Sequence, residues 1–136
     1  MQPFRYLRDP LFLACLGAYF VNRFALKPHV TNAFLHNHFN DLICIPFWVP
    51  VMLWMQRNAG LRAADDPPRA SEMLIPLIVW SITFEIWLPQ TDTFRGWCTA
   101  DPVDVLAYAA GALAAAIWWR WWHARASNSA RRALPS

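Results

Sequence analysis

Seven residues with polar or charged side chains lie within or near the ends of four apolar stretches of this chain. They are Arg23, Asp41, Glu85, Arg95, Asp101, Asp104 and Tyr108. Ionisable side chains are costly inside a membrane and tend to face the interior of a helix bundle, where they pair or line a polar pathway. If the four stretches cross a membrane in alternate directions, these residues all come to the same end. The sequence therefore predicts a shared polar pocket that binds a charged or polar head group.

Glu85 has the least ordinary position of the seven. It lies one turn before Pro89, near the C-terminal end of its stretch, where the helix dipole disfavours a carboxylate. We expect Glu85 to be paired, protonated or used in function. A buried salt bridge to Arg23 or Arg95 is the structural alternative.

Two other positions have a structural interpretation beside the functional one. Asp101, Pro102 and Asp104 follow the pattern of a helix start, with an N-cap, an N1 proline and an acidic residue at N3. Asn40 and Asp41 are expected to cap the second stretch in the same way. Capping accounts for these residue types without a ligand.

Histidine and carboxylate side chains between His36 and Asp41 suggest a metal site, with His36 and His38 as candidate ligands. The spacing of two does not place both histidines on one face of a helix. The chain has neither a CxxC pair nor an HExxH motif, so solvated histidines are the favoured interpretation and no cofactor is expected. No glycine-rich phosphate loop, GxSxG motif or nucleophile–base set is present, which disfavours an enzyme.

The elements that must position these residues follow from composition. Apolar types make up 57% of the 136 residues and charged types 15%, against about 25% charged in ordinary soluble domains. Each apolar stretch is close to the roughly 17–25 residues that span a bilayer. The sequence predicts an all-α membrane protein with a single domain over residues 1–124. Its expected transmembrane helices, which form a four-helix bundle, are about 10–26, 40–55, 72–88 and 102–122.

Smaller features complete this expectation. Pro46 and Pro50 predict a kink in the second helix. Ala107, Gly111 and Ala115 form a row of small residues that lets helix backbones approach closely. The polar segment 125–136 is expected to be a disordered tail.

Lysine and arginine residues set the expected orientation. Nine of them lie before the first stretch, between the second and third, or at the end of the fourth and beyond; the other three lie on the opposite side. The positive-inside rule therefore places both termini in the cytoplasm. The run Trp118–Trp122 is expected to form an interfacial belt there. Since the basic residues flank apolar stretches and form no separate patch, no nucleic-acid partner is expected.

From Glu85 onward, the order of residues resembles the VanZ-like membrane protein family. The matching positions are Glu85, Pro89, Arg95, Asp104, Tyr108 and Gly111, with Tyr108 in place of the usual asparagine. This resemblance implies a role in the cell envelope. A weaker likeness, at His38-Phe39-Asn40-Asp41, Phe84-Glu85 and residues 99–104, is to small bacterial proteins labelled magnesium–citrate secondary transporters.

Three functions remain open from the sequence. The leading hypothesis is a non-enzymatic protein of the bacterial inner (plasma) membrane, multi-pass, which binds an envelope lipid or other amphiphile by its head group. The alternative is an ion- or proton-coupled transporter that works as a homo-oligomer, with Glu85 as the titrating group and Asp41 as its partner. The third is an accessory subunit of a larger membrane complex.

Overall fold

The computed structural model describes residues 4–63, 65–93 and 101–132, with side chains as far as Arg125. These residues form helices and connecting segments, without a strand. In chain order the elements are η1 (Tyr6–Arg8), α1 (Pro10–Val21), η2 (Asn22–Leu26), α2 (Ala33–Asn37), α3 (Phe39–Asn58), α4 (Ala70–Ser81), η3 (Ile82–Trp87), α5 (Leu88–Gln90) and α6 (Pro102–Arg132). The all-helical class predicted from the sequence is thus confirmed.

Among the described residues, three helical segments are long and apolar enough to cross a membrane, namely Ala33–Asn58, Ala70–Gln90 and Pro102–Arg125. Pro10–Leu26 is a shorter apolar helix. Large apolar side chains are exposed on the outward faces of α4 and α6, including Ile75, Ile78, Leu113 and Ile117. Such continuous apolar exposure is typical of helices that face lipid.

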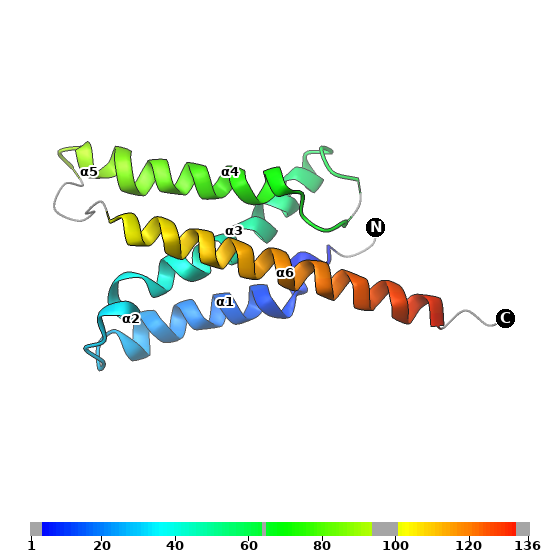
Figure 1. Ribbon diagram of the computed structural model, residues 1–136, viewed down its shortest axis with the longest axis horizontal. Coiled ribbons are helices and arrows are strands. Elements are labelled where there is room, and N and C mark those ends of the chain that lie inside the picture. Colours follow the sequence, from blue (N-terminus) through cyan, green and yellow to red (C-terminus); the bar gives the residue numbers. More distant parts are fainter. Residues whose placement is uncertain (1–3, 64, 94–100, 133–136) are drawn as a thin grey trace.

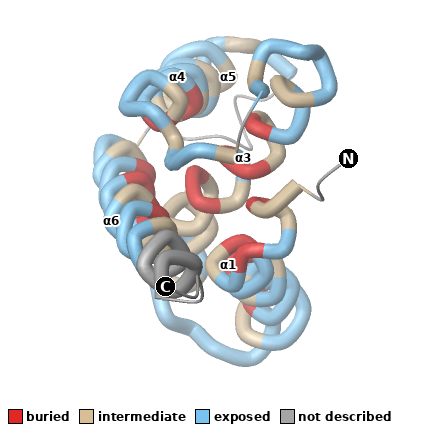
Figure 2. The backbone as a smooth tube through the Cα atoms, turned by 90° about the vertical axis from the view of Figure 1, so that its right-hand side faces the viewer, coloured by how far each residue is buried: buried red, intermediate tan, exposed pale blue. Residues whose placement is uncertain are grey.

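Consecutive long helices run in opposite directions along the molecule, so α3 and α6 point the same way (Figure 1). α2, α5 and the start of α6 lie at one end, which we call the α2 end. The start of α1, the α3–α4 connection and the last turns of α6 lie at the opposite end. α3 packs most extensively on α6, α1 packs on α3, and α4 packs on both α3 and α6. α3 thus lies at the centre, with the buried residues on the faces that surround it (Figure 2).

Local sequence explains where these helices begin. Asp9 caps α1 by accepting a hydrogen bond from the backbone N–H of Leu11 at 2.8 Å, and Pro10 occupies N1. Asn32 caps α2 in the same way through Leu35. The second helical segment therefore begins well before residue 40.

Two predicted helix boundaries differ from the structure. Asn40 and Asp41 were expected to cap the second helix, and this is wrong because α3 begins at Phe39 and His38 is its N-cap. Residues 125–132, expected to be part of a disordered tail, continue α6 as helix to Arg132. This stretch is rich in alanine and arginine, which have high helix propensity.

Both α1 and α4 end in a π-helical turn at the α2 end. In η2 the backbone N–H of Lys27 bonds to the carbonyl of Asn22, and in η3 that of Leu88 bonds to Thr83, each five residues back. Pro89 has no N–H to offer the carbonyl of Glu85, so the α-helical pattern cannot continue there. The wider turns shift the side chains that follow α1 and α4, including Glu85.

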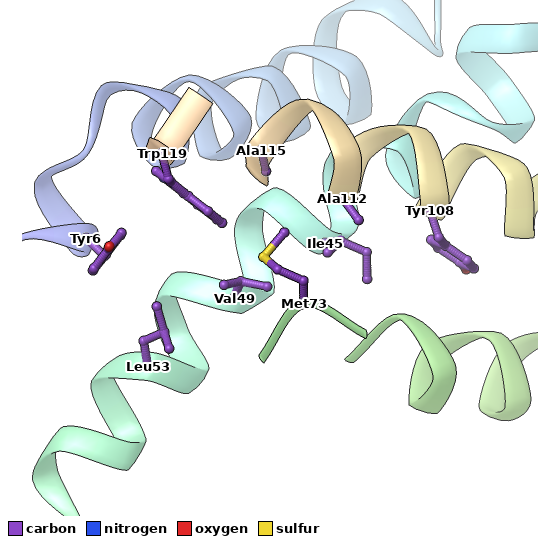
Figure 3. Packing of buried hydrophobic residues seen from close by; sticks show 9 residues of the cluster. All are labelled: Tyr6, Ile45, Val49, Leu53, Met73, Tyr108, Ala112, Ala115 and Trp119. Atoms are coloured by element: carbon purple, nitrogen blue, oxygen red, sulfur yellow. The ribbon is translucent and has the colours of Figure 1, made fainter. Parts of the chain in front are cut away.

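The core lies along the α3–α6 contact (Figure 3). On α6 it is formed by residues spaced by four, three and four, which share one helix face. They are Tyr108, Ala112, Ala115 and Trp119. On α3 the facing residues are Ile45, Val49 and Leu53, all fully buried, and Met73 of α4 and Tyr6 of η1 close the cluster.

The predicted tryptophan belt is formed only in part. Trp119 is fully buried in the core, and Trp118 donates a hydrogen bond from its indole N–H to Asp9 at 3.2 Å. Trp121 is exposed, with the guanidinium of Arg125 3.8 Å from its ring centroid. Helical periodicity turns neighbouring tryptophans to different sides, so a run of them cannot all face the interface.

The row of small residues is confirmed as a packing surface. A Cβ atom at Gly111 would overlap the carbonyl oxygen of Leu42 and lie 3.3 Å from Cδ of Pro46. Pro46 lacks the N–H that would bond to this carbonyl within α3, so Leu42 presents a free acceptor to the backbone of α6. The glycine and the proline together fix how closely α3 and α6 approach.

Candidate functional site

Polar side chains from α3 and α6 meet at the α2 end. His38 Nδ1 lies 2.6 Å from Asp104 Oδ1, which joins the N-cap of α3 to the first turn of α6. A ring nitrogen of His38 and one carboxylate oxygen each from Asp41 and Asp104 lie within 4.8 Å of one another. All three side chains are partly buried. The predicted meeting of Asp41 and Asp104 is therefore observed, with His38 as an additional member.

Tyr108 connects this group to the core. It lies one turn beyond Asp104 on α6, is 3% exposed, and hydrogen-bonds through its hydroxyl to the carboxylate of Asp41. A phenol O–H donates to a carboxylate, so the bond orients Asp41 from the buried side. Tyr108 thus positions the carboxylate rather than merely filling space.

Glu85 is brought to the same place by η3. Its Oε2 accepts a hydrogen bond of 2.6 Å from the backbone N–H of Asp101, and its charge acts on Asp41 and Tyr108. Asp101 in turn accepts a hydrogen bond at 2.9 Å from the backbone N–H of Val103, which confirms it as the N-cap of α6. Glu85 therefore attaches the end of one helix to the start of the next. We call His38, Asp41, Glu85, Asp101, Asp104 and Tyr108 the polar cluster.

Two predicted candidates, Arg23 and His36, lie outside the polar cluster. Arg23 is exposed on η2 and forms no ion pair within the described part of the chain. His36 is also exposed, and its Nε2 lies 2.7 Å from the carbonyl oxygen of Val30. Arg95 lies outside the described residues. The Arg23–Glu85 salt bridge, one of the two structural alternatives for Glu85, is not formed, and Arg23 lies exposed.

A groove opens beside the polar cluster. Its volume is about 590 Å³, within the roughly 300–1,000 Å³ typical of small-molecule sites. It lies between α1 and α4 over the surface of α3, because those two helices do not pack on each other. The lining residues are Cys15, Leu16, Tyr19, Phe20, Asn40, Asp41, Ile43, Cys44, Phe47, Trp48, Trp80, Phe84 and Tyr108.

Aromatic rings dominate the walls of this groove. Trp48 of α3 packs edge-on against Trp80 of α4 at 5.2 Å between centroids, and Trp80 packs against Phe84 at 6.0 Å. On the other side Phe47 stacks on Phe12 of α1 at 5.4 Å. The polar lining gathers at the end formed by Asn40, Asp41 and Tyr108, so the groove is apolar along its length and polar at one end.

Sequence reasoning missed Asn22, which supports this end of the groove. Asn22 is fully buried, and its amide donates to the carbonyl of Leu35 and to Oδ1 of Asn40, each at 3.0 Å. It thereby attaches α1 to α2 and α3. An asparagine within an apolar stretch was the available signal.

The opposite end holds a second polar group that the sequence did not indicate. The Tyr6 hydroxyl lies 2.6 Å both from the carbonyl oxygen of Asp66 and from Nε2 of His123. Asp65 accepts from Arg57 at 2.7 Å and from the backbone N–H of Arg5 at 3.1 Å. The α3–α4 connection is thus attached to the N-terminal segment, which is attached in turn to α6.

Comparison of the chain with protein-family models, with curated proteins and with solved structures finds no match.

Proposed function

We propose that this protein is a non-enzymatic membrane protein that binds an amphiphile, with the apolar chain in the groove and the head group at Asp41. The observation that carries the proposal is the groove itself, whose aromatic walls lead to the partly buried carboxylate of Asp41 and the buried phenol of Tyr108. An apolar chain gains from burial along such walls, and the polar end gives its head group a fixed position.

The charge of the polar cluster selects the head group. Within the described residues, the strongest electrostatic influences on Asp41 come from the carboxylates of Asp104 and Glu85. A protonated amine offsets this negative charge. A hydroxyl donates a hydrogen bond to a carboxylate and adds no negative charge of its own. A carboxylate or phosphate head group meets repulsion. We therefore propose that the ligand has an amine or hydroxyl head group.

Direct titration tests this proposal. The full chain in lipid nanodiscs is titrated with dodecylamine and with dodecanoate. Binding is followed by tryptophan fluorescence, to which Trp48 and Trp80 of the groove wall contribute. We expect the amine to bind and Asp41→Asn to weaken it by about 10–100-fold, since hydrogen bonds to charged groups contribute about 1.5–3 kcal/mol.

The matched control is Glu72→Gln, because Glu72 pairs with Arg62 at the opposite end of the molecule. Glu72→Gln should leave the amine affinity unchanged. Equal affinity for amine and carboxylate chains, or equal losses in the two variants, would refute an acidic head-group site.

We also propose that all four apolar segments cross the membrane, with both termini in the cytoplasm. The support is that the start of α1, the α3–α4 connection and the end of α6 share one end of the molecule and carry nine of the twelve lysines and arginines. Reporter fusions at the α3–α4 connection and after residue 132 should both report the cytoplasm. A fusion in the 27–32 connection should report the other side.

A cell-envelope role in a bacterial plasma membrane, as the VanZ-like resemblance implies, is part of this proposal. It is supported by the interaction in space of Glu85, Asp104 and Tyr108, three residues that carry the resemblance. Transport is less well supported, because the fully buried Ile45, Val49 and Ala115 lie in an apolar layer of the core between the two polar ends. Binding requires only the α2 end, whereas transport requires a path through that layer.

A further inference from the structure

The polar cluster contains an arrangement of side chains that the groove does not require. His38, Asp41 and Asp104 each offer one potential ligand atom, and these three atoms lie within 4.8 Å of one another. His38 and Asp41 are one helical turn apart at the start of α3, and Asp104 comes from the first turn of α6. Three ligands from two helices enclose a space that no single helix creates.

The three candidate ligand atoms favour some metal ions over others. One imidazole nitrogen and two carboxylate oxygens suit Zn²⁺ and neighbouring first-row divalent ions, whereas Mg²⁺ and Ca²⁺ favour oxygen alone. Three protein ligands also leave positions for water or another small ligand, as in open zinc sites.

Residues around these three side chains provide outer-shell support. Tyr108 donates to Asp41 from the core, and Glu85 holds the start of α6 through the N–H of Asp101. Hydrogen bonds of this kind orient ligands and are a regular part of metal sites. The carboxylates of Asp101 and Glu85 also add negative charge beside the site.

The spacing of the two helices is fixed by packing. Gly111 lies two turns beyond Asp104 and contacts the backbone of Leu42, which follows Asp41 directly. The distance between the first turns of α3 and α6 is therefore set by backbone contact. The direct contact of His38 with Asp104 at 2.6 Å shows that this spacing brings the side chains of the two helices together.

We propose that His38, Asp41 and Asp104 bind a single divalent transition-metal ion, for which Zn²⁺ is the best match. The site lies at the polar end of the groove and shares Asp41 with the proposed amphiphile site. It does not depend on that function, since the three ligand side chains all belong to the chain itself. A protonated amine at Asp41 would compete with the ion for the same carboxylate.

The test uses the full chain in detergent, stripped with a chelator and then equilibrated with Zn²⁺ in the absence of added amphiphile. Metal content and competition with a chromophoric chelator give stoichiometry and affinity. We expect one Zn²⁺ per chain, with His38→Ala and Asp104→Asn each weakening binding by at least about 10-fold, because even outer-shell partners are worth roughly 10–100-fold.

His36→Ala is the matched control. This histidine is two residues from His38, is exposed, and contacts the carbonyl of Val30 instead of the polar cluster. It should bind Zn²⁺ as the wild type does. Circular dichroism establishes that each variant is folded. If His38→Ala does not fold, Asp104→Asn, which preserves side-chain size, tests the site alone.

Three results would overturn the metal site: no Zn²⁺ bound by the wild type, equal losses for His36→Ala and His38→Ala, or displacement of Zn²⁺ by an equal concentration of Mg²⁺. Because no amphiphile is added, failure here leaves the dodecylamine titration as a separate test of the groove.

Discussion

The α-carbon of Gly111 rests against the carbonyl oxygen of Leu42, the acceptor that Pro46 leaves without a donor inside α3. Proline in a membrane helix requires that a neighbour accommodate the freed carbonyl. Here the neighbour is the backbone of α6, and only glycine allows it to come so near. The same contact sets how far Asp104 lies from Asp41.

Gly111→Ala should therefore destabilise the fold. The added methyl group overlaps the Leu42 carbonyl, and overpacking of this kind costs about 1–3 kcal/mol or more. Gly17→Ala is the control, since no atom lies within 4 Å of a Cβ built there and alanine is the better helix former by roughly 0.5–1 kcal/mol. Thermal unfolding in detergent should show a lower midpoint for the first variant and an unchanged or higher one for the second. Similar midpoints for both would contradict the close contact.

Glu85 should matter to stability through its hydrogen bond to the N–H of Asp101. Glu85→Ala leaves that N–H without its acceptor and should cost about 1–3 kcal/mol. Glu85→Gln keeps a side-chain oxygen at the same position and should lose less stability than Glu85→Ala. The comparison is made by thermal unfolding of both variants. If the two variants are equally destabilised, Glu85 stabilises the fold through its charge and not through this hydrogen bond.

Tyr6 should stabilise the opposite end of the molecule. Its buried hydroxyl bonds to Asp66 and His123, and each bond is worth about 0.5–1.5 kcal/mol. Tyr6→Phe should lower stability by about 1–2 kcal/mol without affecting amine binding in the groove. Tyr19→Phe, at an exposed position on α1, should have no effect on stability. A loss of amine affinity in Tyr6→Phe would indicate that the two ends are coupled.

The stabilisation by Tyr6 should also depend on pH. Burial raises the pKa of Tyr6 above its ordinary value of 10.0, so the folded state keeps the hydroxyl protonated where the unfolded state loses its proton. The contribution is complete below pH 10 and declines as pH rises beyond it. The stability difference between the wild type and Tyr6→Phe should therefore shrink above pH 10. A difference that stays constant to higher pH would argue against a buried phenol.

Composition and spacing predicted much of the scaffold. Three features could be predicted from short stretches of sequence, because each depends on residues near one another in the chain. They are the apolar stretches, the N-cap at Asp101 and the close approach at Gly111. The start of the second helical segment was placed too late, because Asn32 as a cap and the short helix α2 carry little apolar signal.

The candidate site was predicted in part. Opposite directions of adjacent helices placed Asp41, Glu85 and Asp104 at one end, but they do not say which side chains touch. The pairing of His38 with Asp104 joins residues 66 positions apart, and that of Tyr6 with His123 joins residues 117 apart. The groove exists because α1 and α4 both pack on α3, and no single stretch of sequence encodes that arrangement.

Photo-crosslinking tests the amphiphile groove most directly. A dodecylamine with a diazirine at the end of its chain is added to the full protein in nanodiscs, and labelled residues are identified by mass spectrometry. With the amine at Asp41, the chain should label groove residues further along α1 and α3, such as Leu16 and Phe47, and excess dodecylamine should suppress this labelling. Labelling that instead follows exposure to lipid, at Ile78 and Leu113, and resists competition would contradict binding in the groove.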